Sequence, residues 1–261
     1  MGHQRLGKLP AYRNLPDIVR YLVTGGTPTA DLVEQVTEVG QDSLKRALKD
    51  PVFVEALWLL IQLPQAAASR DFAAALADIG MGAKAPASIS ELLVAYDKAL
   101  ERVQRRLHAD ATDLGEISRR AALAALGNAV QSGMPLWSPT PADVQASVAA
   151  LRSPEKFGAL AHQFHANFVE RVIHYYVDRN LHKIVGADRV ARSVYDLETH
   201  DAAIRRHCYE AALIMRTFAR DWLGKNVYRD GKEIGREDAR RFSAYAAKKI
   251  GIELEKRKGP N

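Results

Sequence analysis

The sequence has little cysteine, no long apolar run and no signal segment, and each absence excludes a class of protein. Cys208 is the single cysteine among 261 residues, so no internal disulfide can form and nothing suggests an oxidising compartment. The most apolar stretch, residues 52–63, contains Glu55 and Gln62 and is far shorter than the roughly 20 residues that span a bilayer. The first residues lack the apolar core of a signal peptide. We therefore expect a cytoplasmic protein that does not enter a membrane.

The composition is that of a folded, basic protein. Hydrophobic residues make up 47% of the chain and charged residues 26%, a balance typical of globular proteins rather than disordered ones. The net charge of +6 favours an anionic partner, such as nucleic acid or an acidic protein surface, because it raises the rate of encounter. Mild basicity also occurs in proteins that bind neither partner, so charge alone leaves the partner open.

Helix start signals recur along the chain, whereas strand signals are nearly absent. Asp50-Pro51 has the N-cap and first-residue pattern of an apolar helix, which we expect to end at Pro64. Ser88 and Glu91 have the spacing of a capping box. Further helix starts are expected at Asn14, Thr29, Ser69, Thr112, Thr140 and Ser153. The sequence predicts an all-α protein, an irregular multi-helix bundle.

The second half of the chain is expected to hold the longest helices. One begins at Pro154 and extends to about residue 182, and another covers about residues 198–223, with Gly224 just past its end. The last helix is expected over residues 237–256. The small-residue run 121–127 in the first half is expected to lie centrally in the core, because small side chains let helices approach closely.

The only sheet element that the pattern allows is one short β-hairpin at residues 227–234. Asp230-Gly231 within it is a residue pair favoured in a type I′ turn. Gly133 to Thr140 is rich in Gly, Pro and Ser or Thr, so it is the best candidate for a boundary. The expected organisation is an extended arm at residues 1–14, one helical subdomain at 15–134 and another at 140–261, or one continuous domain.

Catalytic signatures are scarce. The sequence lacks a phosphate-binding Gly-Lys-Ser/Thr loop and a Gly-x-Ser-x-Gly elbow. Arg102 and His108 have the spacing of the arginine–histidine motif in helical ribonucleases of the higher-eukaryote-and-prokaryote nucleotide-binding type. Val103 stands where that motif usually has a polar residue. The helix macrodipole explains an arginine-rich helix end equally well, so a metal-independent ribonuclease is an alternative hypothesis.

No metal or cofactor site is predicted. His162 and His165 are neighbours on a helix, and Glu170 and His174 are another such pair. However, the His-Glu-x-x-His pattern and cysteine pairs that bind zinc are absent. Cys208 is expected in the core, because Ala211, Ala212 and Met215 follow it on the same helix. Its neighbour His207 points in a different direction, so the two residues are not expected to form a reactive thiolate pair.

Two groups of charged residues suit a structural role or a recognition role. Arg171, His174 and Arg179 lie on one aromatic-rich helix, where we expect a structural polar network or a partner contact. The segment from residue 236 to 258 contains eight Lys or Arg and four Asp or Glu, a net charge of +4. A surface for nucleic acid or a partner is predicted there, made of Arg236, Arg240, Arg241, Tyr245, Lys248 and Lys249. Cations interleaved with aromatics suit phosphate contact and base stacking, and an ordinary amphipathic surface helix explains the same pattern.

Three stretches together resemble a bacterial helical protein family. They are the opening Met1 to Pro10, the run Leu59 to Pro64, and the pattern Phe168-x-x-Arg171-x-x-x-Tyr175-x-x-x-Arg179-x-Leu181-x-x-x-Val185-Gly186. That family is associated with multi-gene defence islands directed against phage. Ile184 stands where the family's late motif usually has His, so the resemblance assigns no chemistry to that position.

The resemblance implies a genomic context of anti-phage defence. Together with the scarcity of catalytic signatures, the helical pattern and the basic C-terminal segment, it predicts a non-catalytic helical subunit of a multi-protein bacterial anti-phage system. Its partners would be other proteins of the same gene cluster, with DNA or RNA as a further partner class. The alternatives are the ribonuclease and a sequence-independent nucleic-acid-binding module. Whether the chain forms a homo-oligomer, and whether the amine of Gly2 has a role, the sequence leaves open.

Overall fold

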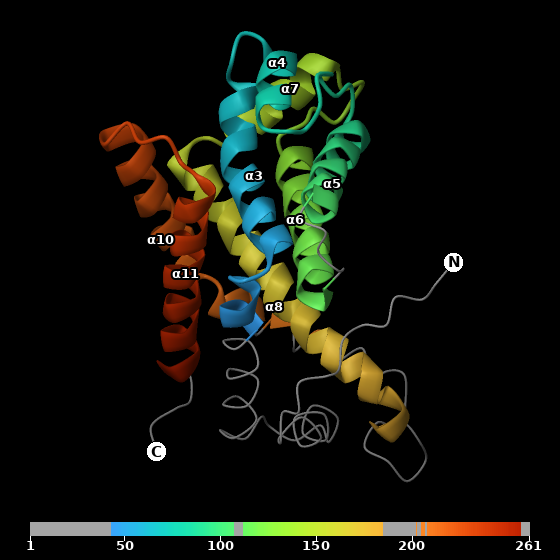
Figure 1. Cartoon of the computed structure of the whole chain (residues 1–261), viewed down its shortest axis with the longest axis vertical. Helices are drawn as coiled ribbons and strands as arrows, with labels where there is room; N and C mark the ends of the chain where they lie inside the picture. Colours follow the sequence, from blue (N-terminus) through green and yellow to red (C-terminus); the bar gives the residue numbers. More distant parts are fainter. Residues whose placement is uncertain (1–42, 107–111, 185–201, 203–204, 207, 257–261) are drawn as a thin grey trace.

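The computed structural model describes residues 43–106, 112–184, 202, 205–206 and 208–256 (Figure 1). For residues 176–184, 251 and 254–256 it describes the backbone alone. The described residues form helices and connecting loops with no strand, so the all-α prediction is confirmed. The expected arm at residues 1–14 and the helix starts at Asn14 and Thr29 lie outside the described residues.

The helix starts follow the predicted caps at several positions. The elements are α3 (Pro51–Ala67), α4 (Phe72–Asp78), α5 (Ile89–Arg106), α6 (Asp113–Gln131), α7 (Pro141–Ala150), α8 (Pro154–Ile184), α10 (Ile214–Leu223), the π-helix η1 (Gly224–Arg229) and α11 (Arg236–Lys256). Asp50 caps α3 by accepting hydrogen bonds from the next backbone N–H groups, and Thr112 caps α6. Thr140 and Asp143 form a reciprocal capping box at the start of α7. These caps satisfy backbone donors that have no partner within their own helix.

Helix α3 is the centre of the bundle (Figure 1). It packs against α5, α6 and α7 and also against α11, while α8 packs against α6 and α10. The fully buried Phe53 of α3 has its ring centroid 5.3 Å from Phe168 and 5.7 Å from Phe164, both in α8. Helices from both sides of the expected boundary at residues 133–140 therefore share α3 as a packing partner. The division into two subdomains stays a prediction.

Small residues allow two close helix contacts. Ala121, Ala122 and Ala125 of α6 are fully buried, which confirms the central place expected for residues 121–127. Gly158 of α8 lies against the backbone of α10, and a Cβ at this position would overlap the carbonyl oxygen of Arg216. The α8–α10 contact therefore depends on the absence of a side chain at position 158. None of the described helices combines the length and the apolarity that a membrane crossing requires.

Two expected helix ends are wrong. Pro64 does not end α3, which continues to Ala67. A proline removes only one backbone hydrogen bond, and the buried side chains of Ala66 and Ala67 stabilise the last turn by packing. The helix expected over residues 198–223 is interrupted by a turn just before α10. The helical backbone of α10 does not stop at Gly224. This glycine has helical φ and ψ angles of −55° and −44°, and the chain continues directly into η1.

The hairpin that the sequence allowed at residues 227–234 does not form. A type I′ turn needs positive φ at both central residues, and here Gly231 has φ +60° whereas Asp230 has φ −95°. The backbone N–H of Asp230 donates to Lys225 O at 2.9 Å, and that of Lys232 donates to Asn226 O at 2.8 Å. Both bonds point back into the helix. The Asp-Gly pair therefore ends a π-helix instead of joining two strands.

Candidate functional site

Helix α11 has one buried face and one exposed face, as an amphipathic surface helix should. The buried face consists of Ala239, Phe242, Ala246, Ala247 and Ile250. The Phe242 ring lies 4.8 Å from the Trp222 ring and 5.2 Å from the Phe218 ring, measured between centroids. This aromatic contact with α10 fixes the rotation of α11, and hence the residues that it presents to solvent.

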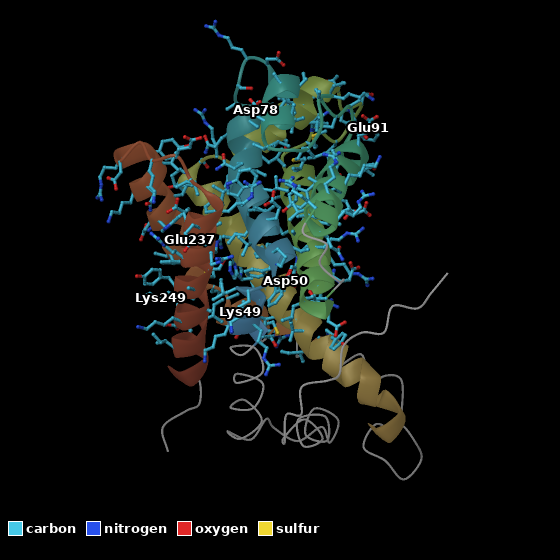
Figure 2. The ribbon with its side chains drawn as sticks, viewed as in Figure 1. Lys49, Asp50, Asp78, Glu91, Glu237 and Lys249 are labelled. Atoms are coloured by element: carbon cyan, nitrogen blue, oxygen red, sulfur yellow. The ribbon has the colours of Figure 1, made fainter. Side chains whose placement is uncertain are left out.

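The exposed side of α11 carries most of the predicted recognition residues. Arg240, Arg241, Tyr245, Lys248 and Lys249 are all exposed, and we call these five residues the α11 basic face. Figure 2 labels Lys249 on this helix, at the outer edge of the bundle. Tyr245 is 62% exposed. An aromatic ring therefore lies between cations on the exposed side of the helix.

Ion pairs reduce the charge of the α11 basic face only slightly. Glu237 accepts from Arg240 at 3.3 Å and lies 3.5 Å from the Arg241 Nε. All three side chains are more than half exposed, so solvent screens these pairs. The four cations and the Glu237 carboxylate together carry a charge of +3. Asp238, which pairs with Lys232 at 2.5 Å, also interacts electrostatically with Arg241. At a helical rise of 1.5 Å, the face spans about 14 Å from Arg240 to Lys249.

Arg236 has a different role from the other predicted surface residues. Its guanidinium binds the Glu55 carboxylate of α3 through two hydrogen bonds, of 2.5 Å and 2.8 Å. Its Cζ atom also lies 3.8 Å from the centroid of the Trp58 ring. Hydrogen bonding to Glu55 raises the pKa of Arg236, so the guanidinium stays charged. The structure thus brings five of the six predicted residues to one face and uses Arg236 to attach α11 to α3.

Comparison with protein-family models, with curated proteins and with solved structures found no match in any of the three. The site therefore has to be argued from its own geometry.

Of the two residues in the ribonuclease hypothesis, the structure describes Arg102 and not His108. Arg102 lies on the exposed side of α5 and donates a hydrogen bond to the backbone oxygen of Gly80. This contact fastens α5 to the loop after α4, a structural task. His108 lies outside the described residues, so the proposed Arg102–His108 pairing stays a prediction.

The expected polar network on α8 is likewise seen in part. Arg171 and His174 are half-buried, and the side chain of Arg179 lies outside the described ones. The neighbouring Glu170 pairs with Arg205 at 3.3 Å. An ion pair thus lies beside the predicted residues and links α8 to the segment before α10. The role of the three residues stays a prediction.

The two buried histidines of α8 point to different backbone oxygens. The Nε2 atom of His162 lies 2.9 Å from Tyr209 O, and the Nδ1 atom of His165 lies 2.7 Å from Ala161 O. Burial lowers the pKa of His162 and lowers that of His165 to about 4, so both rings are neutral at pH 7. Within the described residues no three His, Cys, Asp or Glu side chains converge in a way that could hold a metal ion.

Cys208 is in the core, as its sequence context suggested. It is 2% exposed, and burial, followed by the nearby Glu170 charge, raises the pKa of its thiol. The thiolate is the reactive form of cysteine. Cys208 is therefore poorly suited to nucleophilic chemistry at neutral pH.

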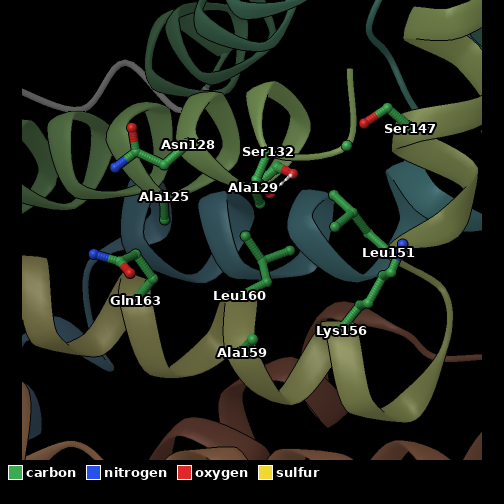
Figure 3. Close-up of a pocket in the computed structure, with 11 residues that line it drawn as sticks. Ala125, Asn128, Ala129, Ser132, Ser147, Leu151, Lys156, Ala159, Leu160 and Gln163 are labelled. Carbon is green, nitrogen blue, oxygen red and sulfur yellow. Dashed lines mark hydrogen bonds between the residues drawn. The ribbon is translucent and has the colours of Figure 1, made fainter. Parts of the chain in front are cut away.

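A cleft of about 380 Å³ lies between α6, α7 and α8 (Figure 3). Its buried lining residues are the apolar Ala125, Leu151 and Leu160 and the polar Ser147, whose hydroxyl donates to Val130 O at 2.7 Å. Its exposed rim carries Asn128 and Lys156, and Lys156 is the only charged residue of the lining. The cleft thus combines apolar side chains with one ammonium at its rim.

The sequence interpretation missed two exposed residues beside this cleft. Leu136 is 91% exposed and Trp137 is 86% exposed, in the loop that joins α6 to α7. We call this pair the Leu–Trp knob. The segment was taken only as a boundary, because Gly, Pro and Ser dominate it. The Leu136-Trp137 pair could have indicated an exposed contact surface, because large apolar side chains are uncommon in solvent-exposed loops.

Proposed function

We propose that this chain is a non-catalytic helical subunit of a multi-protein bacterial anti-phage system in the cytoplasm. It acts by binding an acidic surface on another protein of the same gene cluster through the α11 basic face. The observation that carries this proposal is the exposed set of four cations around Tyr245, displayed on a helix that its other face holds rigidly. The assignment to anti-phage defence rests on the sequence resemblance alone.

The physical argument concerns what the α11 basic face can do. Exposed cations on one side of a protein steer an anionic partner toward that side and raise the association rate. An exposed tyrosine at the centre adds contact area at low entropic cost, which is why tyrosine is enriched at binding hot spots. The five residues of the face include no carboxylate, histidine or cysteine, so they suit recognition.

Co-purification with the proteins encoded beside this chain tests the proposal. The key variant replaces Arg240, Arg241, Lys248 and Lys249 by Ala, and capture of the partner should fall at least tenfold. The matched control replaces Lys84, Lys98, Arg105 and Arg120, which are exposed residues of α5, α6 and the loop before α5. Both variants lose four positive charges, so a role of net charge alone would affect them equally. Equal capture by the wild type and the key variant would contradict the proposal.

Sequence-independent nucleic-acid binding by the same face is the second candidate, and exposed Tyr245 is the observation that favours it. The 14 Å span of the face matches roughly four nucleotides along one strand of B-form DNA. The logarithm of affinity should fall linearly with the logarithm of salt concentration. The variant with four alanine substitutions should reduce the magnitude of that slope by roughly 3–4. Tyr245→Ala should weaken single-strand binding by about 1–3 kcal/mol. A flat salt response in fluorescence anisotropy would exclude this candidate.

A further inference from the structure

The Leu–Trp knob is a fixed apolar projection. Pro135 and Pro139 bracket it and restrict the backbone, and Ser138 has a φ of +47°, which is uncommon for a residue other than glycine. The loop is anchored at both ends. On the α6 side, Gly133 N donates to Val130 O at 3.0 Å, and on the α7 side the capping box begins at residue 140. A restrained loop loses little conformational entropy when it binds, so this knob is prepared for contact.

A complementary cavity lies in the same chain. The α6–α7–α8 cleft shares Ser132 and Gly133 with the base of the loop, so the knob projects from the edge of the cleft. High exposure of both knob residues shows that neither enters the cleft of its own chain. In Figure 3, Ala159 and Leu160 of α8 face the cleft from below. The lining combines alanine and leucine side chains with the polar groups of Asn128, Ser132, Ser147, Lys156 and Gln163.

We propose that two copies of this chain associate by placing the Leu–Trp knob of each copy in the α6–α7–α8 cleft of the other. In a two-fold contact the same patch serves both copies, which requires the patch to be complementary to itself. A projecting apolar pair next to an apolar cleft meets that requirement. Trp137 fills the cleft with its indole ring, while Asn128 and Gln163 at the cleft supply oxygen acceptors for the indole N–H.

Charge also matches across this contact. The loop and helix start from residue 133 to 143 contain one acidic residue, Asp143, and no basic residue. The cleft lining contains one basic residue, Lys156, and no acidic residue. Lys156 at the rim can also lie over the face of an inserted indole in a cation–π contact. No pair of like charges has to be buried between the two copies.

The area of such a contact indicates its strength. A buried Trp covers roughly 150–250 Å². Two knobs, together with the two cleft walls that they cover, approach the lower limit of about 1,200 Å² for stable interfaces. We therefore expect a weak dimer with a dissociation constant in the micromolar range. Such a dimer dissociates and re-forms readily in solution.

Sedimentation velocity across a wide range of protein concentration tests the inference. The wild type should shift from monomer to dimer, whereas Trp137→Ala and Ala159→Phe should each stay monomeric. The first variant removes the knob and the second fills the cleft from its α8 side. Circular dichroism melting checks that both variants fold. Tyr245→Ala is the matched control, since it removes an exposed aromatic ring from another face and should leave dimerisation unchanged.

Mixing the two variants separates this geometry from other dimers. Trp137→Ala keeps a free cleft and Ala159→Phe keeps a free knob, so the mixture should form a heterodimer through one of the two contacts, at least tenfold weaker than the wild-type dimer. A wild type that stays monomeric at every concentration would overturn the inference, as would a dimer that survives Trp137→Ala. So would a monomer whose Trp137 inserts into lipid vesicles, seen as a blue shift of its fluorescence that Trp137→Ala abolishes. Trp137→Ala and Ala159→Phe leave all five residues of the α11 basic face unchanged, so partner capture by these two variants tests the proposed function separately.

Discussion

Glu55 and Arg236 form a two-point ion pair across 181 positions of sequence, with hydrogen bonds of 2.5 Å and 2.8 Å. The Glu55 side chain is only 4% exposed, whereas that of Arg236 is 52% exposed. The pair lies beside two further contacts between the same elements. Trp58 Nε1 and Gln62 Nε2 both donate to the backbone oxygen of Ile234, at 3.0 Å and 2.8 Å. Together these contacts hold the start of α11 against α3 and so orient the α11 basic face.

Removing one partner of this ion pair should destabilise the protein. Arg236→Ala leaves the Glu55 carboxylate buried without its cation, and we expect a loss of about 1–3 kcal/mol in the free energy of unfolding. Urea denaturation followed by circular dichroism measures it. Arg241→Ala is the control on the same helix, because its exposed pair with Glu237 should contribute less than about 1 kcal/mol. Equal effects of the two substitutions would contradict a structural role for Arg236.

Gly158→Ala should separate α8 from α10. The new Cβ would overlap the Arg216 carbonyl oxygen, which is backbone and cannot move freely, so we expect a net loss of about 1–3 kcal/mol despite the higher helix propensity of alanine. Gly127→Ala is the matched control in α6, where the Cβ would meet only the Leu93 side chain at 3.4 Å. Thermal melting should show that variant equal to or more stable than the wild type. If Gly158→Ala were as stable as the wild type, α8 and α10 would have to lie further apart than the structure shows.

Acid should destabilise the folded state through His165. Its pKa is about 4 in the folded protein and 6.5 when unperturbed, because burial disfavours the charged ring. The unfolded chain therefore binds the proton first. Stability is fully retained above pH 6.5 and falls by up to about 1.4 kcal/mol per pH unit as pH drops from 6.5 toward 4. His165→Leu should flatten this part of the curve of unfolding free energy against pH, whereas an unchanged slope would assign it to other groups.

Cys208 should react slowly with thiol reagents while the protein is folded. Its burial excludes the reagent, and the raised pKa keeps the sulfur protonated. Because the sequence has one cysteine, labelling with a maleimide gives a single, unambiguous rate. The rate should rise at least a hundredfold in denaturant. Fast labelling of the native protein would indicate that the segment before α10 opens readily.

Local sequence signals predicted the helices well where a cap fixes the start. Asp50, Thr112 and Thr140 all cap helices as expected, because a cap depends on residues within four positions of one another. The long α8 and the central small residues of α6 were also predicted, from apolar periodicity and side-chain size. These signals failed at Pro64 and at Asp230-Gly231, where packing decides whether the helix continues or ends. A proline or an Asp-Gly pair favours a particular local backbone conformation, and the packing of buried neighbouring side chains can outweigh that preference.

The sequence by itself determined that the chain is all-α and that α11 carries a surplus of positive charge, since both follow from residue type and short-range spacing. Only the tertiary structure decided which of those charges are exposed and which form an ion pair within the fold. It paired Arg236 with Glu55, turned Tyr245 outward and formed the cleft beside the Leu–Trp knob. Each of these depends on residues far apart in the chain, whose proximity is set by how helices pack and not by any local pattern.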